Sequence, residues 1–219
     1  MTWDDRRETV SVRPREDEPA GSVVEGWSRL FTYLVIAIMV GITIAVPFLG
    51  LVLAVAGASY LRAGDVHARR HRTGLLRLLG GPLTAPLDLV RGVAGTLVSL
   101  PYAAVFAVIL PLAVMAAGAV DVEVHPLVAA AWGVGAAAYV LMAGPGVRAP
   151  RRHLLRVFTA LANEPHLIAV VGGLLCALAL AALAGAIVLQ PAFAPMYELK
   201  NSISQALSRF QDSIRQRVA

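Results

Sequence analysis

The sequence has very few of the residues from which catalytic and metal centres are assembled. Cys176 is its single cysteine, which excludes an intrachain disulfide and a cluster of thiolate ligands. Walker-type, zincin and nucleophile-elbow patterns are all missing. No polar stretch is long enough for a second core, so a kinase, ATPase or deaminase domain does not fit. We therefore expect no enzymatic activity, no cofactor and no metal site.

Charge is also missing from four long stretches of the chain. A helix needs about 20 apolar residues to cross a hydrocarbon core of ~30 Å, and each stretch is long enough. Their lack of ionisable groups counts against a proton-coupled pump or a charge-sensing channel. The sequence predicts an all-α integral membrane protein. The four stretches are Leu30–Leu61, Gly92–Val120, Pro126–Val147 and Leu167–Tyr197.

The first stretch is too long for one straight crossing, since a helix over Leu30–Leu61 would measure about 48 Å. Near its middle, Pro47 removes a backbone donor and Gly50 permits a tight turn. We expect a helical hairpin that enters and leaves on one face, and the alternative is a single kinked and tilted span. The other three stretches are predicted to be three transmembrane helices.

Arginine is concentrated in two connections between these stretches. Residues 62–91 carry six arginines against two aspartates, and residues 148–166 carry four arginines against one glutamate, whereas residues 121–125 are acidic. Arginine-rich loops stay in the cytoplasm, so we expect both there, with the acidic turn and the C-terminus outside. Lys200 is the only lysine. This preference for arginine suggests a GC-rich genome and hence a bacterial plasma (inner) membrane.

Three regions are expected along the chain. Residues 1–29 are polar and mixed in charge, and we expect a disordered tail. Residues 30–192 form the helical membrane domain. Residues 193–219 carry a C-terminal amphipathic helix, because their apolar side chains recur at intervals of three or four.

Residues 73–100 have the pattern of a helix that lies on the membrane surface. Gly80, Gly81, Pro82 and Pro86 interrupt the segment. After Pro86, apolar residues recur at helical spacing with charged residues off that face. We therefore expect an interfacial helix that turns into the bilayer near Pro101.

Small residues recur at every fourth position in the last two transmembrane stretches. On a helix such residues form one stripe, which lets another backbone approach closely in lipid. We expect the two stretches to pack against each other or to form a contact between protomers; chance in an alanine-rich span is the alternative. The stripes are Gly173, Ala177, Ala181 and Gly185, and Ala129, Gly133 and Ala137.

The arginines of the two basic connections form the best candidate for a binding surface. They would attract anionic headgroups at ~1 kcal/mol each, although retention of arginine in the cytoplasm is enough to explain them. Nucleic acid is not expected, because no aromatic residues are interleaved for stacking. The candidate residues for anionic lipid or a protein partner are Arg62, Arg69, Arg70, Arg72, Arg77, Arg148, Arg151, Arg152 and Arg156.

The segment Trp27–Asp65 contains Trp-Ser-Arg, an apolar run, Val-Pro-Phe-Leu-Gly and Leu-Arg-Ala-Gly-Asp. It resembles the membrane region that follows the catalytic domain in some actinobacterial serine/threonine protein kinase-like proteins. The glycine-rich loop, the HRD loop and the DFG motif of a kinase do not occur here. The resemblance therefore implies a membrane region without kinase activity.

Two functions are compatible with these features. The first is a non-enzymatic multi-pass membrane scaffold or accessory subunit, which binds anionic lipid or a protein partner. The second is a homo-oligomeric channel or permeability factor lined by uncharged helices. Membrane lipid is the expected partner in both, together with a second copy of the chain or another membrane protein.

Overall fold

The structure is a computed structural model that describes residues 19–70, 86–118, 125–145, 147–161, 165–193 and 197–218. Every regular element in these residues is a helix, so the all-α class is confirmed. Five of the helices, α1, α2, α4, α5 and α7, are long and apolar enough to cross a membrane. The helices are α1 (Pro19–Ala45), α2 (Pro47–Arg70), α4 (Pro86–Gly118), α5 (Pro126–Ala143), α6 (Ala149–Leu161), α7 (Pro165–Val188) and α8 (Tyr197–Val218).

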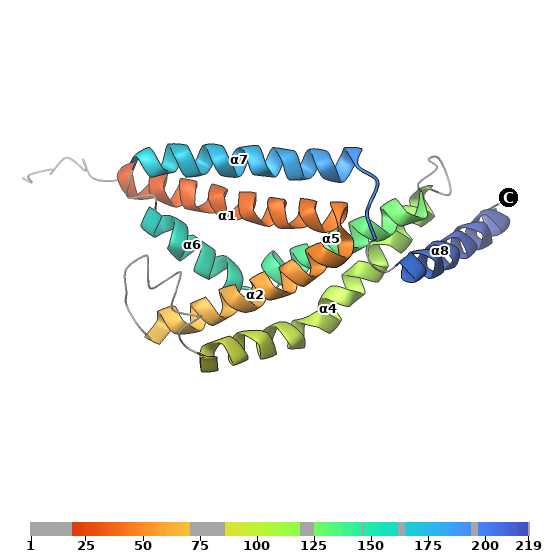
Figure 1. Cartoon of the computed structure of the whole chain (residues 1–219), viewed down its shortest axis with the longest axis horizontal. Helices are drawn as coiled ribbons and strands as arrows, with labels where there is room; N and C mark the ends of the chain where they lie inside the picture. Colours follow the sequence, from red (N-terminus) through yellow and green to blue (C-terminus); the bar gives the residue numbers. More distant parts are fainter. Residues whose placement is uncertain are drawn as a thin grey trace, which may run out of the picture.

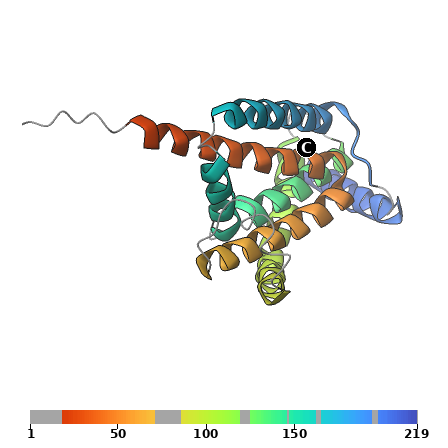
Figure 2. The same ribbon diagram turned by 60° about the vertical axis from the view of Figure 1, so that its left-hand side comes forward.

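The five apolar helices run back and forth between two ends of the molecule, which lie at the left and the right in Figure 1. At one end α1 and α7 begin, α2 ends, α4 begins and α6 lies across the helices; we call this the arginine end. At the opposite end α1 turns into α2, α4 ends, α5 begins and α8 lies. Figure 2 shows the same division from a second direction. Successive apolar helices therefore alternate in direction.

The first charge-free stretch forms the helical hairpin and not the single kinked span. The helix is interrupted at Val46, and Pro47 begins α2, which runs back toward the arginine end (Figure 1). The Gly50 N–H donates to the Val46 carbonyl at 2.8 Å. A Cβ on Gly50 would lie 2.3 Å from Thr43 Cα, so only glycine allows the two arms to meet this closely at the turn.

The number of spans differs from the prediction of three transmembrane helices plus a hairpin. Each arm of the hairpin is itself long enough to cross, with 23 residues in α1 and 22 in α2. The reason is that both arms extend past the charge-free stretch. Helix α1 already begins at Pro19, within the predicted disordered tail of residues 1–29, and α2 continues through Arg62 and Asp65 to Arg70.

The predicted interfacial helix over residues 73–100 is also corrected. Residues 71–85 lie outside the described residues, and residues 86–118 form one continuous helix, α4, with Pro101 and Pro111 inside it. A proline removes one backbone donor and bends a helix, but neighbouring helices can satisfy the freed carbonyl within a membrane domain. Asp88 and Arg91 therefore belong to a helix of spanning length, which the sequence had not predicted.

Helix α5 occupies the centre of the molecule, packed against α1, α2 and α4. Ala129, Gly133 and Ala137, the predicted stripe on this helix, are all buried. A Cβ on Gly133 would lie 2.4 Å from the Ala107 carbonyl oxygen and 2.7 Å from Pro111 Cδ. The stripe is therefore the surface on which α4 packs.

The predicted pairing of the third and fourth transmembrane stretches within one chain is not what the structure contains. Helix α7 packs along α1, and a Cβ on Gly41 of α1 would lie 2.8 Å from the Ala182 carbonyl carbon. The predicted α7 stripe faces elsewhere, because Gly173, Ala177 and Ala181 are exposed and Gly185 is half-buried. The close contact between α1 and α7 is formed by Gly41 and Ala182. Neither residue belongs to the predicted four-residue stripes.

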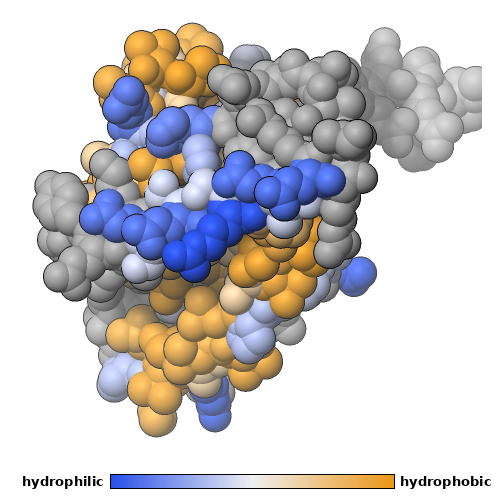
Figure 3. All heavy atoms as spheres, turned by 90° about the vertical axis from the view of Figure 1, so that its right-hand side faces the viewer, coloured by the Kyte–Doolittle hydropathy of each residue, from blue (hydrophilic) through white to orange (hydrophobic). Residues whose placement is uncertain are grey.

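Two amphipathic helices complete the structure. Helix α6 lies in a connection for which no helix was predicted, and it buries Leu154, Val157 and Phe158. Helix α8 covers the segment for which the C-terminal amphipathic helix was predicted, and Ile203 and Leu207 pack near Ile44 and Ala130. Figure 3 shows the end at which α8 lies, where a hydrophilic band separates two hydrophobic surfaces.

The close contact between α4 and α5 gives the first prediction. Gly133→Ala adds a methyl group against a backbone carbonyl, so it should destabilise the protein by about 1–3 kcal/mol. Gly173→Ala is the matched control, since nothing lies within 4 Å of a Cβ there. The thermal midpoint in detergent measures both variants. A midpoint for Gly133→Ala equal to that of Gly173→Ala would contradict the packing described.

Candidate functional site

Helices α2 and α6 are joined at the arginine end by one ion pair. Arg156 Nη1 on α6 lies 2.7 Å from Asp65 Oδ1 on α2. The Asp65 side chain is 3% exposed and the Arg156 side chain 40% exposed. A buried carboxylate is costly unless it is paired, so this contact explains how α2 carries a charge past the apolar stretch.

Arg62 joins α2 to α4 in a similar way. Its guanidinium donates through Nη1 to the Gly95 carbonyl and through Nη2 to Ser99 Oγ, the latter at 2.9 Å. An arginine within an apolar helix is expensive unless its donors find acceptors. Both acceptors lie on α4, so the charge of Arg62 is oriented by that helix.

A second pairing between α2 and α4 involves a histidine and a carboxylate. His67 Nδ1 lies 3.3 Å from Asp88 Oδ2, and the Asp88 side chain is buried. Arg91, one turn further along α4, approaches Asp88 Oδ1 at 4.0 Å. Asp88 therefore offsets part of the positive charge of this end.

His153 packs α6 directly onto α2. Its side chain is buried, and a Cβ on Gly64 would lie 2.4 Å from the ring carbon Cε1. Neither ring nitrogen has a hydrogen-bond partner among the described residues. Burial lowers the pKa of His153, an effect that Asp65 opposes and Arg156 reinforces. The imidazole is therefore neutral near pH 7 and acts here as a packing surface.

A groove opens between α2, α4 and the start of α6, and we call it the arginine groove. Its volume is about 530 Å³. Arginines from three parts of the chain line it, together with small and apolar residues. The lining consists of Arg62, Val66, Arg91, Gly92, Gly95, Val98, Ser99, Val147, Arg148, Ala149 and Arg152.

The structure brings together only some of the predicted arginines. Arg62, Arg148 and Arg152 line the arginine groove, while Arg156 is paired with Asp65. Arg91 also lines the groove and was not among the predicted candidates. The sequence feature that could have identified Arg91 is its position after Pro86, at the start of a pattern of apolar residues with helical spacing. The side chains of Arg69 and Arg70 at the end of α2, and all of Arg72 and Arg77, lie outside the described residues.

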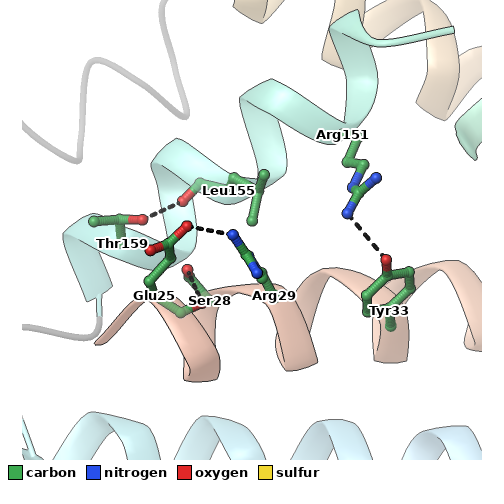
Figure 4. Close-up of polar contacts among 7 residues, drawn as sticks. All are labelled: Glu25, Ser28, Arg29, Tyr33, Arg151, Leu155 and Thr159. Carbon is green, nitrogen blue, oxygen red and sulfur yellow. Dashed lines mark hydrogen bonds and ion pairs between the residues drawn. The ribbon is translucent and has the colours of Figure 1, made fainter. Parts of the chain in front are cut away.

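Arg151 points away from the groove, toward α1. Its Nη2 donates to Tyr33 Oη at 3.0 Å, and its guanidinium lies 5.3 Å from the centre of the Tyr33 ring. Figure 4 shows this contact beside the exposed pair of Glu25 and Arg29 on α1. Neighbouring arginines on α6 thus serve different surfaces.

The guanidinium groups at the arginine end could bind an anion. Guanidinium groups are planar donors that bind phosphate or carboxylate through two hydrogen bonds. Among the residues that the structure describes, no group of three His, Cys, Asp or Glu side chains could hold a metal ion. His71, Asp121 and Glu123 lie outside the described residues.

Comparison with known proteins adds no family to this description. The chain matches no protein-family model, no curated protein and no solved structure. The function proposed below therefore rests on the geometry and charge of the arginine end.

The pair of Asp65 and Arg156 gives the second prediction. Arg156→Gln removes the guanidinium that contacts the buried Asp65 carboxylate at 2.7 Å and should destabilise the protein by about 2 kcal/mol, less than for a fully buried pair because Arg156 is partly exposed. In an Asp65→Asn background the same change should cost under about 0.5 kcal/mol.

Unfolding in detergent with increasing denaturant measures this cycle. The control is Arg29→Gln, which breaks an exposed pair with Glu25 and should cost at most about 0.5 kcal/mol. Equal costs for Arg156→Gln with and without Asp65 would show that the two side chains are not coupled.

Proposed function

We propose that this chain is a non-enzymatic multi-pass membrane scaffold or accessory subunit that binds anionic lipid or a protein partner through its arginine end. One observation carries the proposal: Arg62 of α2 and Arg148 and Arg152 at the start of α6 come from two distant parts of the chain and line the same groove. Among the described residues none of them pairs with a carboxylate. Such a surface attracts anions at ~1 kcal/mol for each arginine near a membrane.

The non-enzymatic part of the proposal is supported by what the ionisable groups of this end already do. Asp65 pairs with Arg156, and His67 pairs with Asp88. These contacts hold α2, α4 and α6 together. The groups that would otherwise be candidates for acid or base chemistry are thus used in packing.

The orientation of the protein follows from the same end. The start of α1 and helix α6 both lie at the arginine end, so we infer that they share one side of the membrane. We place that side in the cytoplasm of a bacterial plasma membrane, because arginine is retained there. Helix α8 and the C-terminus are then outside.

A homo-oligomeric channel is the second candidate, and the exposed face of α7 favours it. Gly173, Ala177 and Ala181 lie on this face, where they do not contact the rest of the chain closely enough to be buried. Small residues on an exposed membrane helix permit another helix to approach. Several copies joined there would enclose uncharged surface.

Ion flux separates the two candidates and gives the third prediction. Purified protein in liposomes should conduct ions no faster than empty liposomes, because the scaffold has no pore to open. Liposomes that contain a known ionophore are the positive control. Mass measurement in detergent accompanies the assay, and a pure monomer would remove the channel.

Robust conductance that disappears in Ala177→Leu would contradict the scaffold and establish the channel. That substitution places a bulky side chain on the exposed α7 face without touching the arginine groove. Silence, together with a protein that co-purifies in stoichiometric amount, is the result expected for a scaffold.

A further inference from the structure

We propose that the arginine groove binds the headgroup of one anionic glycerophospholipid, with its acyl chains along the exposed face of α4. The inference rests on the proposed function, since it names the ligand of the same end. The volume of about 530 Å³ lies within the ~300–1,000 Å³ typical of small-ligand sites. The groove is thus large enough for a phosphate and its glycerol.

The charge of the groove selects an anion. Arg91 is partly offset by Asp88 at 4.0 Å, but Arg62, Arg148 and Arg152 have no carboxylate partner among the described residues. Their positive charges converge on one space. A guanidinium forms two parallel hydrogen bonds with a phosphate, so phosphate is the group that suits this lining best.

Arg62 is held in the orientation that such a ligand needs. A guanidinium has five N–H donors, and the contacts with Gly95 and Ser99 use two of them. The others remain for a ligand beside the groove. Helix α6 begins at Ala149 in the groove wall, and the positive end of its dipole adds to the same field.

The apolar part of the lining distinguishes a lipid from a soluble phosphate. Val98 forms part of the groove and is 81% exposed. Tyr102, Val105 and Ile109 follow on α4 at intervals that place them on the same face, and all are exposed. The stripe leads from the groove along a helix of spanning length. A free phosphate has no use for it, whereas acyl chains would cover it.

The number of arginines also predicts a preference among lipids. A single phosphate diester carries one negative charge and would leave most of the groove's positive charge unmatched. A headgroup with two phosphates matches more of it. We therefore expect cardiolipin to bind more tightly than phosphatidylglycerol, and phosphatidylcholine to bind least.

Native mass spectrometry of the full chain in neutral detergent, titrated with each of the three lipids, tests the assignment. The double variant Arg148→Gln and Arg152→Gln should weaken cardiolipin binding about thirtyfold, at about 2 kcal/mol for two arginines. The matched control is Arg151→Gln with Arg209→Gln. It removes the same charge from side chains outside the groove and should change binding less than threefold.

Several outcomes would overturn the assignment. Equal losses of cardiolipin affinity in the two double variants would mean that the protein attracts lipid by its overall charge. Equal binding of phosphatidylglycerol and phosphatidylcholine would remove the anion site. Glycerol 3-phosphate that competes as strongly as cardiolipin would assign the groove to a soluble phosphate.

The variant Val98→Ser tests the apolar part of the lining. It should weaken the binding of lipid and leave the binding of glycerol 3-phosphate unchanged.

The test separates this inference from the scaffold itself. A co-purifying protein that is lost from the groove variant, with lipid binding unchanged, would assign the groove to a protein and leave the scaffold intact. Arg148 and Arg152 are exposed, so the variant should keep the thermal midpoint of the wild type. If it does not, Arg152→Gln alone should weaken cardiolipin about fivefold.

Discussion

The structure depends on one constraint: a charge that enters a membrane helix must have its partner already in place. Asp65 is buried on α2 because Arg156 of α6 reaches it at 2.7 Å. Arg62 lies one turn earlier, with its guanidinium against α4. These contacts allow α2 to continue to Arg70, which makes it long enough to cross a membrane. They also fix α4 and α6 at the same end, and so create the arginine groove.

The second constraint is steric. Without a hydrophobic gain between helices in lipid, packing must come from close contact of backbones. Gly133 allows α4 to lie directly on α5, Gly41 allows α7 to lie on α1, and Gly64 gives room to the ring of His153. The resulting arrangement leaves α4 and α7 largely exposed, which suits helices that face lipid. The same exposure of α4 leaves free the surface along which we propose that acyl chains lie.

Much of this architecture could be predicted from residues of strong local effect. Pro47 and Gly50 marked the hairpin, the four charge-free stretches marked the apolar helices, and the spacing of apolar residues marked α8. Helix ends were less predictable, because the sequence does not show that Asp65 meets a residue 91 positions later. Charged residues were therefore placed in loops. The α7 stripe is not buried within the chain for a related reason, since a regular repeat does not reveal which face of a helix packs against the rest of its own chain.

The candidate site was predicted in composition and not in arrangement. Arginine-rich connections indicated an anionic partner, yet they could not separate Arg152, which lines the groove, from Arg151, which contacts Tyr33. That difference depends on the angle of α6, a helix in a connection for which none was predicted. Arg91 entered the site because α4 begins at Pro86 and continues through Pro101. The groove is thus a product of tertiary packing and not of a motif.

The central claim is that the arginine end and α8 lie on opposite sides of the membrane, and cysteine labelling tests it most directly. In a Cys176→Ala background, Thr159→Cys on α6 and Ser213→Cys on α8 place one exposed thiol at each end. With a membrane-impermeant maleimide on intact cells, Ser213→Cys should react at once and Thr159→Cys only after permeabilisation. Labelling of both thiols from the same side would contradict the arrangement of the helices and the placement of the groove.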